Sequence, residues 1–442
     1  MEIPMAGALC GLVFLILTLL GVPVVFSLGF SAVSVGLLTY GVTCLPKAAW
    51  TPFYGLYNLG FVALPLFVLI GCIIAETPMG TELYDMARKW LSRLRGGLVA
   101  AGIIGEAVMA AAIGTSMACI LVVGKSAVRE LEKYGYRKEF GLGALLAGGC
   151  LGPLIPPSMP MIIYSVLANV SLGRLFTAGI IPGIILTAML SLTALAICRF
   201  KPEWAFTPQA ARLAKEEERF TWGERLAALR RTWPLVALIL AILGSIYMGL
   251  ATPAEASGIG SVVALLLALL VYGVRASGLR RALEETAVIN GIIMFILIGA
   301  SFFSYIMGSA NIAKYLPALI ESWGISRWTV IIVINVILLI LGCLLDAATI
   351  TFLTVPIFVP LVTALGFDPI WFGVVFLVNT QIGVITPPVG MDTFTAANVF
   401  GVPVGDLVRG VLPFLIVLLV FLAIVTAFPQ LSLWLVNVTV AG

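Results

Sequence analysis

The sequence predicts an all-α membrane protein that crosses the bilayer many times and is built from two inverted repeats. Three observations lead to this fold class: long apolar runs, the spacing of basic loops, and a proline-broken segment that occurs twice. Of the 442 residues, 61% are hydrophobic and only 10% are charged, and the mean hydropathy is +1.14. Soluble domains carry roughly 25% charged residues. Many apolar runs here exceed the ~20 residues that a helix needs to cross a bilayer.

The composition also argues against several classes of function. The chain has no histidine, which is the commonest general base and a frequent metal ligand. Its seven cysteines are scattered through apolar runs without a CxxC pair, which is typical of small apolar fillers. The net charge of +4 is explained by basic loops, so no nucleic-acid partner is expected. Without HExxH or GxGD motifs, we expect no enzyme, no catalytic residue and no organic cofactor.

The basic clusters set the number of crossings. Lysine and arginine gather in residues 82–95, 125–139, 199–231 and 275–285. Short basic loops tend to stay in the cytoplasm, so consecutive clusters require an even number of crossings between them. Three crossings before residue 82 and one through residues 410–439 then place both termini outside the cytoplasm.

The charge rule divides the chain into four parts. The weakly polar stretch between the first two clusters fits a re-entrant hairpin, because a single crossing would separate the clusters. The predicted parts are N-terminal scaffold helices in 1–81; a first repeat in 82–199 with a hairpin (96–124) and a broken helix (140–168); a cytoplasmic loop and scaffold helices in 200–310; and a second repeat in 311–442 with a hairpin (328–362), a broken helix (369–400) and a final helix. The first repeat begins inside and the second outside, so their topologies are inverted.

The broken segments read GPLIPPSMP at 152–160 and GVITPPVGM at 383–391. An offset of 231 aligns their glycines and proline pairs, and such repeats with broken helices indicate the binding site of a secondary transporter. Irregular backbone survives in hydrocarbon only inside protein or beside a cavity. We therefore expect the freed carbonyl oxygens to bind a small cation, helped by the dipoles of the helix ends. The alternative is that the prolines only kink packed helices.

Several polar residues inside the apolar runs are functional candidates, because burying them is costly. Asp346 is the leading acid, for ion or substrate binding or as a hairpin cap, whereas Asp392 either binds or faces water at a cavity mouth. Glu106 lies in the descending arm of the first hairpin. Asn398 is either a substrate ligand or an interhelical hydrogen-bond partner. Lys125 fits a snorkelling lysine better than an anion-binding one.

The motifs GTSMA, GPLIPPSMPMIIYSV, LFTAGIIPG, ATPAEA, LGCLLDAATI and GVITPPVGMDTF occur in this order. They closely resemble the large permease (M) subunit of tripartite ATP-independent periplasmic (TRAP) transporters, the DctM-like family, over about residues 5–435. The resemblance implies an elevator-type symporter in a bacterial or archaeal inner membrane, driven by sodium ions. It implies import of an organic anion, a carboxylate or sulfonate, delivered by a periplasmic substrate-binding protein. It also implies a small four-helix membrane subunit on a separate chain.

The resemblance places the candidate ligands residue by residue. One sodium site would use Gly114, Thr115, Ser116, Gly152, Ile155 and Pro157, the other would use Asp346, Thr349, Gly383, Thr386, Pro388 and Met391, and substrate would lie between the hairpin tips near Ser158, Asp346, Asp392 and Asn398. Two residues depart from the family pattern: Asp392 stands where an amide is frequent, and Lys125 stands where the family is usually uncharged. The main alternative is a stand-alone ion-coupled anion carrier of a related hairpin-containing fold. Inverted repeats with hairpins favour alternating access over a passive channel.

Overall fold

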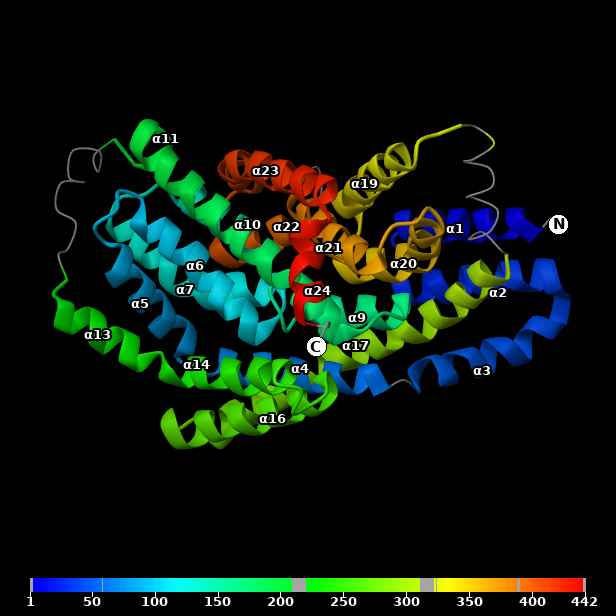
Figure 1. Cartoon of the computed structure of the whole chain (residues 1–442), viewed down its shortest axis with the longest axis horizontal. Coiled ribbons are helices and arrows are strands. Elements are labelled where there is room, and N and C mark those ends of the chain that lie inside the picture. The colour runs from blue at the N-terminus through cyan, green and yellow to red at the C-terminus, as the bar shows by residue number, and fades with distance from the viewer. Residues whose placement is uncertain are drawn as a thin grey trace.

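The structure is a computed structural model that describes residues 3–57, 59–208, 220–310, 322, 324–387 and 390–439. Every regular secondary-structure element in these ranges is a helix (Figure 1). An isolated β-bridge joins Tyr136 to Phe206. Seven of the described helical segments are long and apolar enough to span a membrane, or up to nine when two bent helix pairs are included. The predicted all-α, multi-pass membrane class is confirmed.

One group of helices comes from the N-terminal part and the middle of the chain. It contains α1 (Ile3–Leu19), α2 (Val24–Tyr40), α3 (Cys44–Leu56), α4 (Ala63–Ala75), α5 (Met79–Leu91), α13 (Trp222–Arg231), α14 (Trp233–Ile239), α15 (Ser245–Tyr247), α16 (Pro253–Leu266) and α17 (Ala276–Ser309). The long helix α17 packs against α2, α3 and α4, and α16 packs against α4. In Figure 1 α13, α14, α4 and α3 follow one another along one edge of the molecule.

The other group consists of two similar series of five helices. The first is α6 (Gly97–Ile113), α7 (Ser116–Lys133), α8 (Lys138–Gly149), α9 (Met159–Ala168) and α10 (Leu172–Phe200); the second is α19 (Arg327–Leu344), α20 (Ala347–Ala364), α21 (Pro369–Ile385), α22 (Met391–Phe400) and α23 (Val404–Ala427). In each series the first two helices are joined by two residues, and a non-helical stretch separates the third from the fourth. These breaks fall at both predicted hairpin tips and both predicted broken segments.

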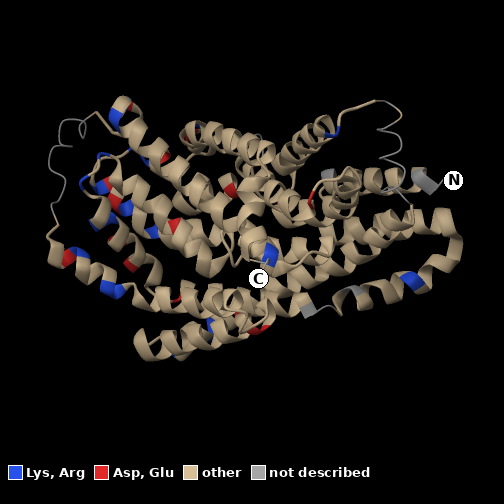
Figure 2. Cartoon of the chain, in the orientation of Figure 1, with Lys and Arg blue, Asp and Glu red and all other residues tan. Residues whose placement is uncertain are grey.

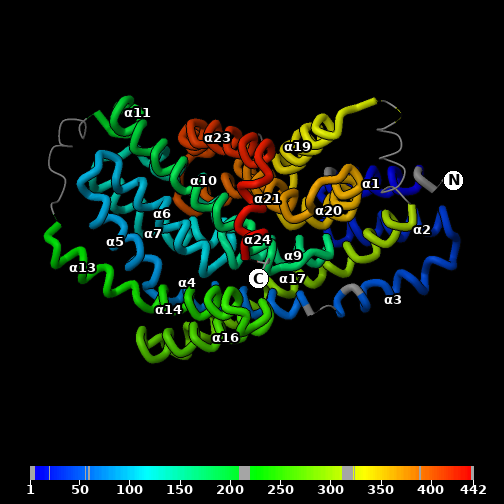
Figure 3. Tube along the Cα trace, viewed as in Figure 1, coloured from blue at the N-terminus to red at the C-terminus, as the bar shows by residue number. Residues whose placement is uncertain are grey.

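The two series pack together with matching contacts. The contact of α8 with α23 is mirrored by that of α21 with α10, and the contact of α9 with α20 is mirrored by that of α22 with α7. Between the halves, the Cys150 Sγ lies 3.7 Å from the carbonyl oxygen of Gln381, and these residues are related by the 231-residue offset. Figure 3 shows the two series meeting at the centre of the molecule. The internal repeat in the sequence therefore corresponds to a repeat in the packing.

Two short helices complete the described chain. Helix α11 (Pro202–Ala205) follows α10, and α24 (Gln430–Thr439) follows α23 and lies across α10. The single closing helix expected over residues 410–439 is divided at Phe428 and Pro429. Proline lacks the amide hydrogen that a continuous helix needs at this position, which explains the division.

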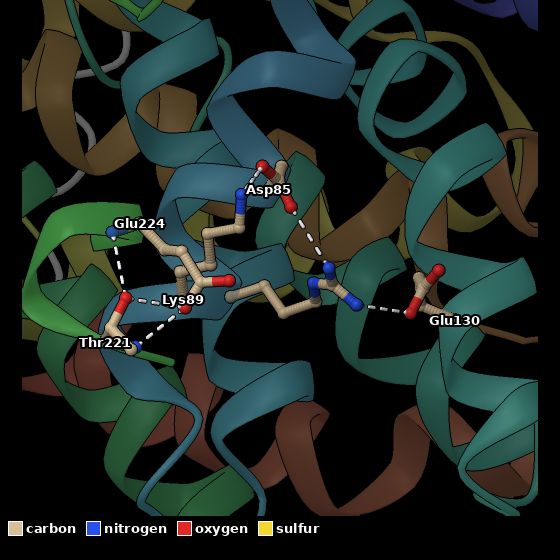
Figure 4. Close-up of polar contacts among 6 residues, drawn as sticks. Asp85, Lys89, Glu130, Thr221 and Glu224 are labelled. Carbon is tan, nitrogen blue, oxygen red and sulfur yellow. Dashed lines mark hydrogen bonds and ion pairs between the residues drawn. The ribbon is translucent and has the colours of Figure 1, made fainter. Parts of the chain in front are cut away.

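Charged residues gather at one end of the molecule, around α5, α7, α11 and α13, and are sparse near the N-terminus (Figure 2). At the charged end Arg88 of α5 contacts Glu130 of α7 at 2.7 Å and Asp85 at 3.1 Å, and Lys89 contacts Asp85 at 2.6 Å (Figure 4). The Thr221 and Glu224 side chains form a capping box that starts α13. Amphipathic α5 is thus joined to the first hairpin by polar contacts.

A second ion pair holds α17 to the bend between α4 and α5. The Nη2 of Arg281 lies 2.5 Å from the Oε2 of Glu76. Hydrogen bonding to Arg281 lowers the pKa of the Glu76 carboxyl, and the nearby charge of Lys125 acts in the same direction. Lys125 is exposed on α7 at this place, away from the hairpin tips.

Candidate functional site

The first hairpin tip rests directly on the first broken segment. Helix α6 is capped by Gly114, whose φ of +72° lies in the left-handed region that glycine adopts most readily. The carbonyl oxygen of Gly114 accepts a hydrogen bond from the amide of Met159 at 3.2 Å. A Cβ atom at Gly152 would lie 2.7 Å from the carbonyl carbon of Thr115, so no side chain separates the two backbones. Gly114 in the hairpin and Gly152 in the broken segment make this close approach possible.

The first break leaves backbone oxygens without amide partners. Among the described residues, the carbonyl oxygens of Gly152, Ile155 and Pro157 accept no hydrogen bond. Ser158 restarts the helix: its hydroxyl donates to the Pro153 carbonyl at 2.6 Å and accepts from the Met161 amide at 3.4 Å. Free carbonyl oxygens in an otherwise apolar interior are suitable ligands for a hard cation.

The second hairpin tip is capped by its own aspartate. The Asp346 Oδ1 accepts from the amides of Ala348 and Thr349, both at 3.0 Å, and the Thr349 hydroxyl donates to Oδ2. The hairpin-cap interpretation of Asp346 is therefore realised in the structure. Both Asp346 oxygens are positioned by the first turn of α20, whose N-terminus favours negative charge.

The second break contacts its hairpin slightly before the tip. The Gly390 amide donates to the Cys343 carbonyl at 3.4 Å, and a Cβ at Gly383 would lie 2.5 Å from the Cα of Gly342. The Thr386 hydroxyl, at the end of α21, donates to the Ile382 carbonyl at 2.5 Å. Pro388 of the predicted sodium site lies outside the described residues. The two hairpins thus meet their broken helices in similar but not identical registers.

A cavity of about 220 Å³ lies where both tips and both breaks come together. Its lining residues are Thr115, Ser116, Met117, Pro153, Met159, Pro160, Ile163, Ile293, Asp346, Ala347, Ala348, Thr351, Gln381, Val384, Met391 and Asp392. The Ser116 hydroxyl donates to the Asp392 Oδ2 at 2.7 Å across the cavity wall, which joins the first hairpin to the second broken helix. Four helices, α7, α9, α20 and α22, begin at this cavity.

The structure brings many of the predicted site residues to this one place. Thr115, Ser116, Asp346, Met391 and Asp392 line the cavity. Gly114, Gly152 and Gly383 form the backbone contacts described above, and a Cβ at Gly114 would lie 2.4 Å from the carbonyl oxygen of Pro157. Ile155 lies in the first break, Thr349 is buried beside Asp346, and Thr386 follows the last residue of α21. Their roles as ligands stay predictions.

Three candidates lie elsewhere. Ser158 is buried as the cap of α9 and does not line the cavity. Asn398 is exposed about two turns along α22 from the break, also outside the cavity lining. Glu106 is fully buried in α6, and neither carboxylate oxygen has a hydrogen-bond partner among the described residues. Ser158 and Asn398 would need another conformation to contact a ligand in the cavity. Glu106 would need a bound ion or proton to satisfy its carboxylate.

Sequence reasoning missed three polar residues at the site. Thr351 is buried and lines the cavity, and its hydroxyl donates to the Ala347 carbonyl at 2.6 Å. Gln381 is 2% exposed, lines the cavity, and its Oε1 has no hydrogen-bond partner among the described residues. Thr393 is buried, and its hydroxyl donates to the Ile385 carbonyl at 2.9 Å, bridging the second break. The signal was present for Gln381, because an amide inside an apolar run is a functional candidate by default.

Two larger cavities lie away from the tips. One of about 580 Å³ separates α3 and α17 from α9 and α20, and another of about 360 Å³ lies between α5, α7 and α13. Neither is lined by residues of a hairpin tip or a broken segment. In the described ranges, no group of three or more histidine, cysteine, aspartate and glutamate side chains is arranged to hold a metal ion. The tip cavity is therefore the best candidate site.

Solved structures first identify the class of fold. The transporter YdaH of Alcanivorax borkumensis superposes with a TM-score of 0.63 over 96% of this chain and 98% of that chain, at 15% sequence identity. At this identity the likeness shows the fold alone. The chain therefore has the helical fold of a multi-pass membrane transporter.

Sequence comparison then identifies the family. The family model described as "Tripartite ATP-independent periplasmic transporter, DctM component" matches residues 12–431, and the chain belongs to this family of large TRAP permease subunits. The large permease DctM of a C4-dicarboxylate TRAP transporter from Pseudomonas aeruginosa is 35% identical over 85% of this chain and 86% of its own length. The resemblance deduced from the motifs is confirmed. Because the family consists of transporter permeases, the protein is not an enzyme.

The names of other relatives refer to different solutes. The large permease SiaM of a sialic acid TRAP transporter from Vibrio cholerae is 31% identical over 98% of both chains. The large permease TeaC of an ectoine TRAP transporter from Halomonas elongata is 29% identical over 86% of this chain and 87% of its own. Membership of the family therefore does not fix the solute.

Proposed function

We propose that this chain is the large membrane subunit of a sodium-coupled importer of a small organic acid, a carboxylate or sulfonate. A periplasmic substrate-binding protein delivers the acid, and a separate small membrane subunit completes the complex. The family supports both partners, because a tripartite transporter needs two further components. The relatives' names support an acidic solute, since C4-dicarboxylates and sialic acid are carboxylic acids.

The observation that carries the proposal is the convergence of four helix N-termini on one cavity. Helices α7, α9, α20 and α22 all begin there. Each N-terminus brings the positive end of a helix dipole, a favourable environment for an anion. The first-turn amides of α7 and α22 have no capping side chain, whereas Ser158 caps α9 and Asp346 caps α20. The two broken helices and the two hairpins supply these four helix N-termini inside the membrane. They do so without a lysine or arginine in the described lining of the cavity. We place the carboxylate or sulfonate of the substrate at these helix N-termini.

Sodium coupling rests on the oxygen atoms beside the same cavity. The first break leaves carbonyl oxygens unpaired at Gly152, Ile155 and Pro157, next to the first hairpin tip. The second site combines the Asp346 carboxylate with the Thr386 hydroxyl, whose hydrogen is donated to Ile382 so that its lone pairs remain free. Hard alkali cations prefer such carbonyl, hydroxyl and carboxylate oxygens. A sodium ion at each break would neutralise buried negative charge and complete the anion site.

We place the two repeat series in a body that moves across the membrane as an elevator. The cavity is lined by residues of these series, with Ile293 of α17 as the only contribution from the other helix group among the described residues. The hairpins are re-entrant in this arrangement, and the charged end in Figure 2 faces the cytoplasm, since basic loops stay inside. The N-terminus then lies outside, as the sequence predicts.

The test is sodium-driven uptake by the complete tripartite complex in proteoliposomes. The complex is expected to accumulate its solute only when an inward sodium gradient is imposed, and only with the binding protein present. Accumulation driven equally well by a proton gradient without sodium would contradict the coupling. Uptake by the large subunit alone would favour the stand-alone carrier instead.

A further inference from the structure

The charges around the tip cavity are unbalanced for a simple anion site. Two carboxylates, Asp346 and Asp392, line the cavity, while no lysine or arginine is among its lining residues. Asp346 caps α20, and Asp392 lies in the first turn of α22, positions where the helix dipole favours the charged carboxylate. The two sodium ions of the proposed function would bring two positive charges. The negative charges of Asp346 and Asp392 balance these two positive charges. No net positive charge from side chains or ions then remains to bind a dianion.

Two hydrogen-bond acceptors are available in the lining of the cavity. The Oδ2 of Asp392 accepts from Ser116, whereas its Oδ1 has no partner among the described residues. The Oε1 of Gln381, a residue only 2% exposed, is also without a partner there. A buried acceptor left without a donor costs about 1–3 kcal/mol, which applies to the Gln381 Oε1. Both oxygens can accept hydrogen bonds from a ligand that donates them.

The acceptors at Asp392 and Gln381 suit a ligand group that donates hydrogen bonds. Ser116 and Asp392 are hydrogen-bonded directly at 2.7 Å, so the serine already satisfies one carboxylate oxygen. What remains is one charged acceptor and one amide oxygen, which match the N–H groups of a protonated amine or amidine. Opposite charge at hydrogen-bond distance in a low-dielectric cavity gives a strong, directional contact.

We propose that the transported acid is a zwitterion, with a positively charged nitrogen that Asp392 and Gln381 bind. Its carboxylate or sulfonate faces the helix N-termini, and its nitrogen faces these two acceptors. The inference rests on the proposed function and deepens it, because it names the charge class of the substrate. The cavity of about 220 Å³ restricts that class to small solutes.

The first experiment uses the wild-type tripartite complex in proteoliposomes with an inward sodium gradient. The probe is an equimolar panel of small organic acids, in which each nitrogen-free acid is matched by a zwitterion of equal chain length, such as succinate and 4-aminobutanoate. Mass spectrometry of the lumen is expected to show accumulated acids that carry a cationic nitrogen. Accumulation of nitrogen-free acids only would overturn the inference and leave the proposed function intact. Absence of any sodium-driven accumulation would reject both.

The second experiment compares Asp392→Asn with the matched control Asp406→Asn, which removes a half-exposed carboxylate at the start of α23, 4.0 Å from Arg409 and outside the cavity lining. Loss of a charge-assisted contact is expected to lower uptake of the zwitterionic acid by about tenfold or more. The sodium concentration for half-maximal uptake stays unchanged, and the control behaves as wild type. An increased sodium requirement with unaltered selectivity would assign Asp392 to a coupling ion and overturn the inference. Gln381→Met is expected to shift selectivity in the same direction, which keeps the test valid if Asp392→Asn is produced in low yield.

Discussion

At the scale of single residues, the hydroxyl side chains at the breaks share one arrangement. Ser116 donates to Asp392, Thr386 to Ile382 and Thr393 to Ile385. A hydroxyl has one hydrogen to donate and two lone pairs to offer, so each oxygen keeps acceptor capacity after its hydrogen is used. The sodium sites that we propose would therefore need little rearrangement at Thr386 and Ser116 to accept a cation.

Thr386→Ala tests this role. Removing one oxygen ligand is expected to raise the sodium concentration for half-maximal uptake by about three- to tenfold, an effect on the order of one hydrogen-bond-sized contact. The thermal midpoint of the purified protein changes little, because the Ile382 carbonyl keeps its position in α21. Sodium titration of uptake measures the effect. Thr386→Ser is expected to restore the wild-type value, and Thr395→Ala, which removes an exposed hydroxyl of α22, serves as control. An unaltered sodium dependence in Thr386→Ala removes Thr386 from the site.

The sequence predicted the residue types at the site better than their geometry. Asp346 stood out because a charge inside an apolar run requires a reason, and it lies at the cavity as a cap. Ser158 looked equally suitable, yet its hydroxyl is used by Pro153 and Met161. Gln381 was passed over, although it lies at the cavity. Which face of a broken helix a side chain occupies depends on how the break is packed, and the sequence pattern does not specify this.

At the scale of elements, glycine pairs allow helices to approach at backbone distance. A Cβ at Gly383 would lie 2.5 Å from the Cα of Gly342, and one at Gly143 would lie 2.2 Å from the carbonyl carbon of Gly410. These contacts join α19 to α21 and α8 to α23. Helices in membranes often associate through small residues that let their backbones approach closely. The hydrophobic effect does not drive this association, because lipid tails are as apolar as the helix surfaces.

Gly383→Ala is expected to destabilise the protein, because the added methyl group meets the backbone of α19 rather than a flexible side chain. Overpacking of this kind costs typically about 1–3 kcal/mol. The measurement is the thermal midpoint in detergent, which should fall by several degrees. Gly291→Ala is the matched control, since a Cβ at this helical glycine of α17 has nothing within 4 Å. It is expected to leave the midpoint unchanged or slightly higher. Equal midpoints for the two variants would show that the contact between α19 and α21 is not tight.

Elements were predictable where the sequence contains an explicit break. The hairpin expected over residues 328–362 corresponds to α19 and α20, and the break at the first Pro-Pro pair separates α8 from α9. The contact register was not predictable. The first broken helix meets its hairpin at the tip, whereas the second meets its hairpin at Gly342 and Cys343. Glycine pairing decides these registers, and pairing between distant segments is not visible in local patterns.

At the scale of the whole molecule, the repeat series and the other helices meet across the larger cavity of about 580 Å³. Its walls include Ser301 and Leu297 of α17 on one side and Leu167 of α9 and Pro356 of α20 on the other. A body that slides past α17 must change the shape of this space. A bulky group attached there is therefore expected to hinder the movement.

Labelling Ser301→Cys with a fluorescein maleimide tests the relative movement. Modification before reconstitution is expected to lower sodium-driven uptake by about tenfold or more, because the label would occupy the space between the two helix groups that the proposed elevator movement displaces. Ser277→Cys, exposed at the start of the same helix, controls for labelling as such, and the unsubstituted chain controls for the native cysteines. Full uptake by protein labelled at Ser301→Cys would mean that this cavity keeps its shape during transport.

In the proposed function, substrate binds between the two hairpin tips, beside sodium ions held at the breaks. The sharpest test is an experimental structure of the tripartite complex with sodium and its transported solute. We expect solute density in the cavity lined by Ser116, Asp346, Gln381 and Asp392, with the acid group at the helix N-termini. Solute density in the cavity between α3 and α17 and the repeat helices, with the tip cavity empty, would rule out this binding site.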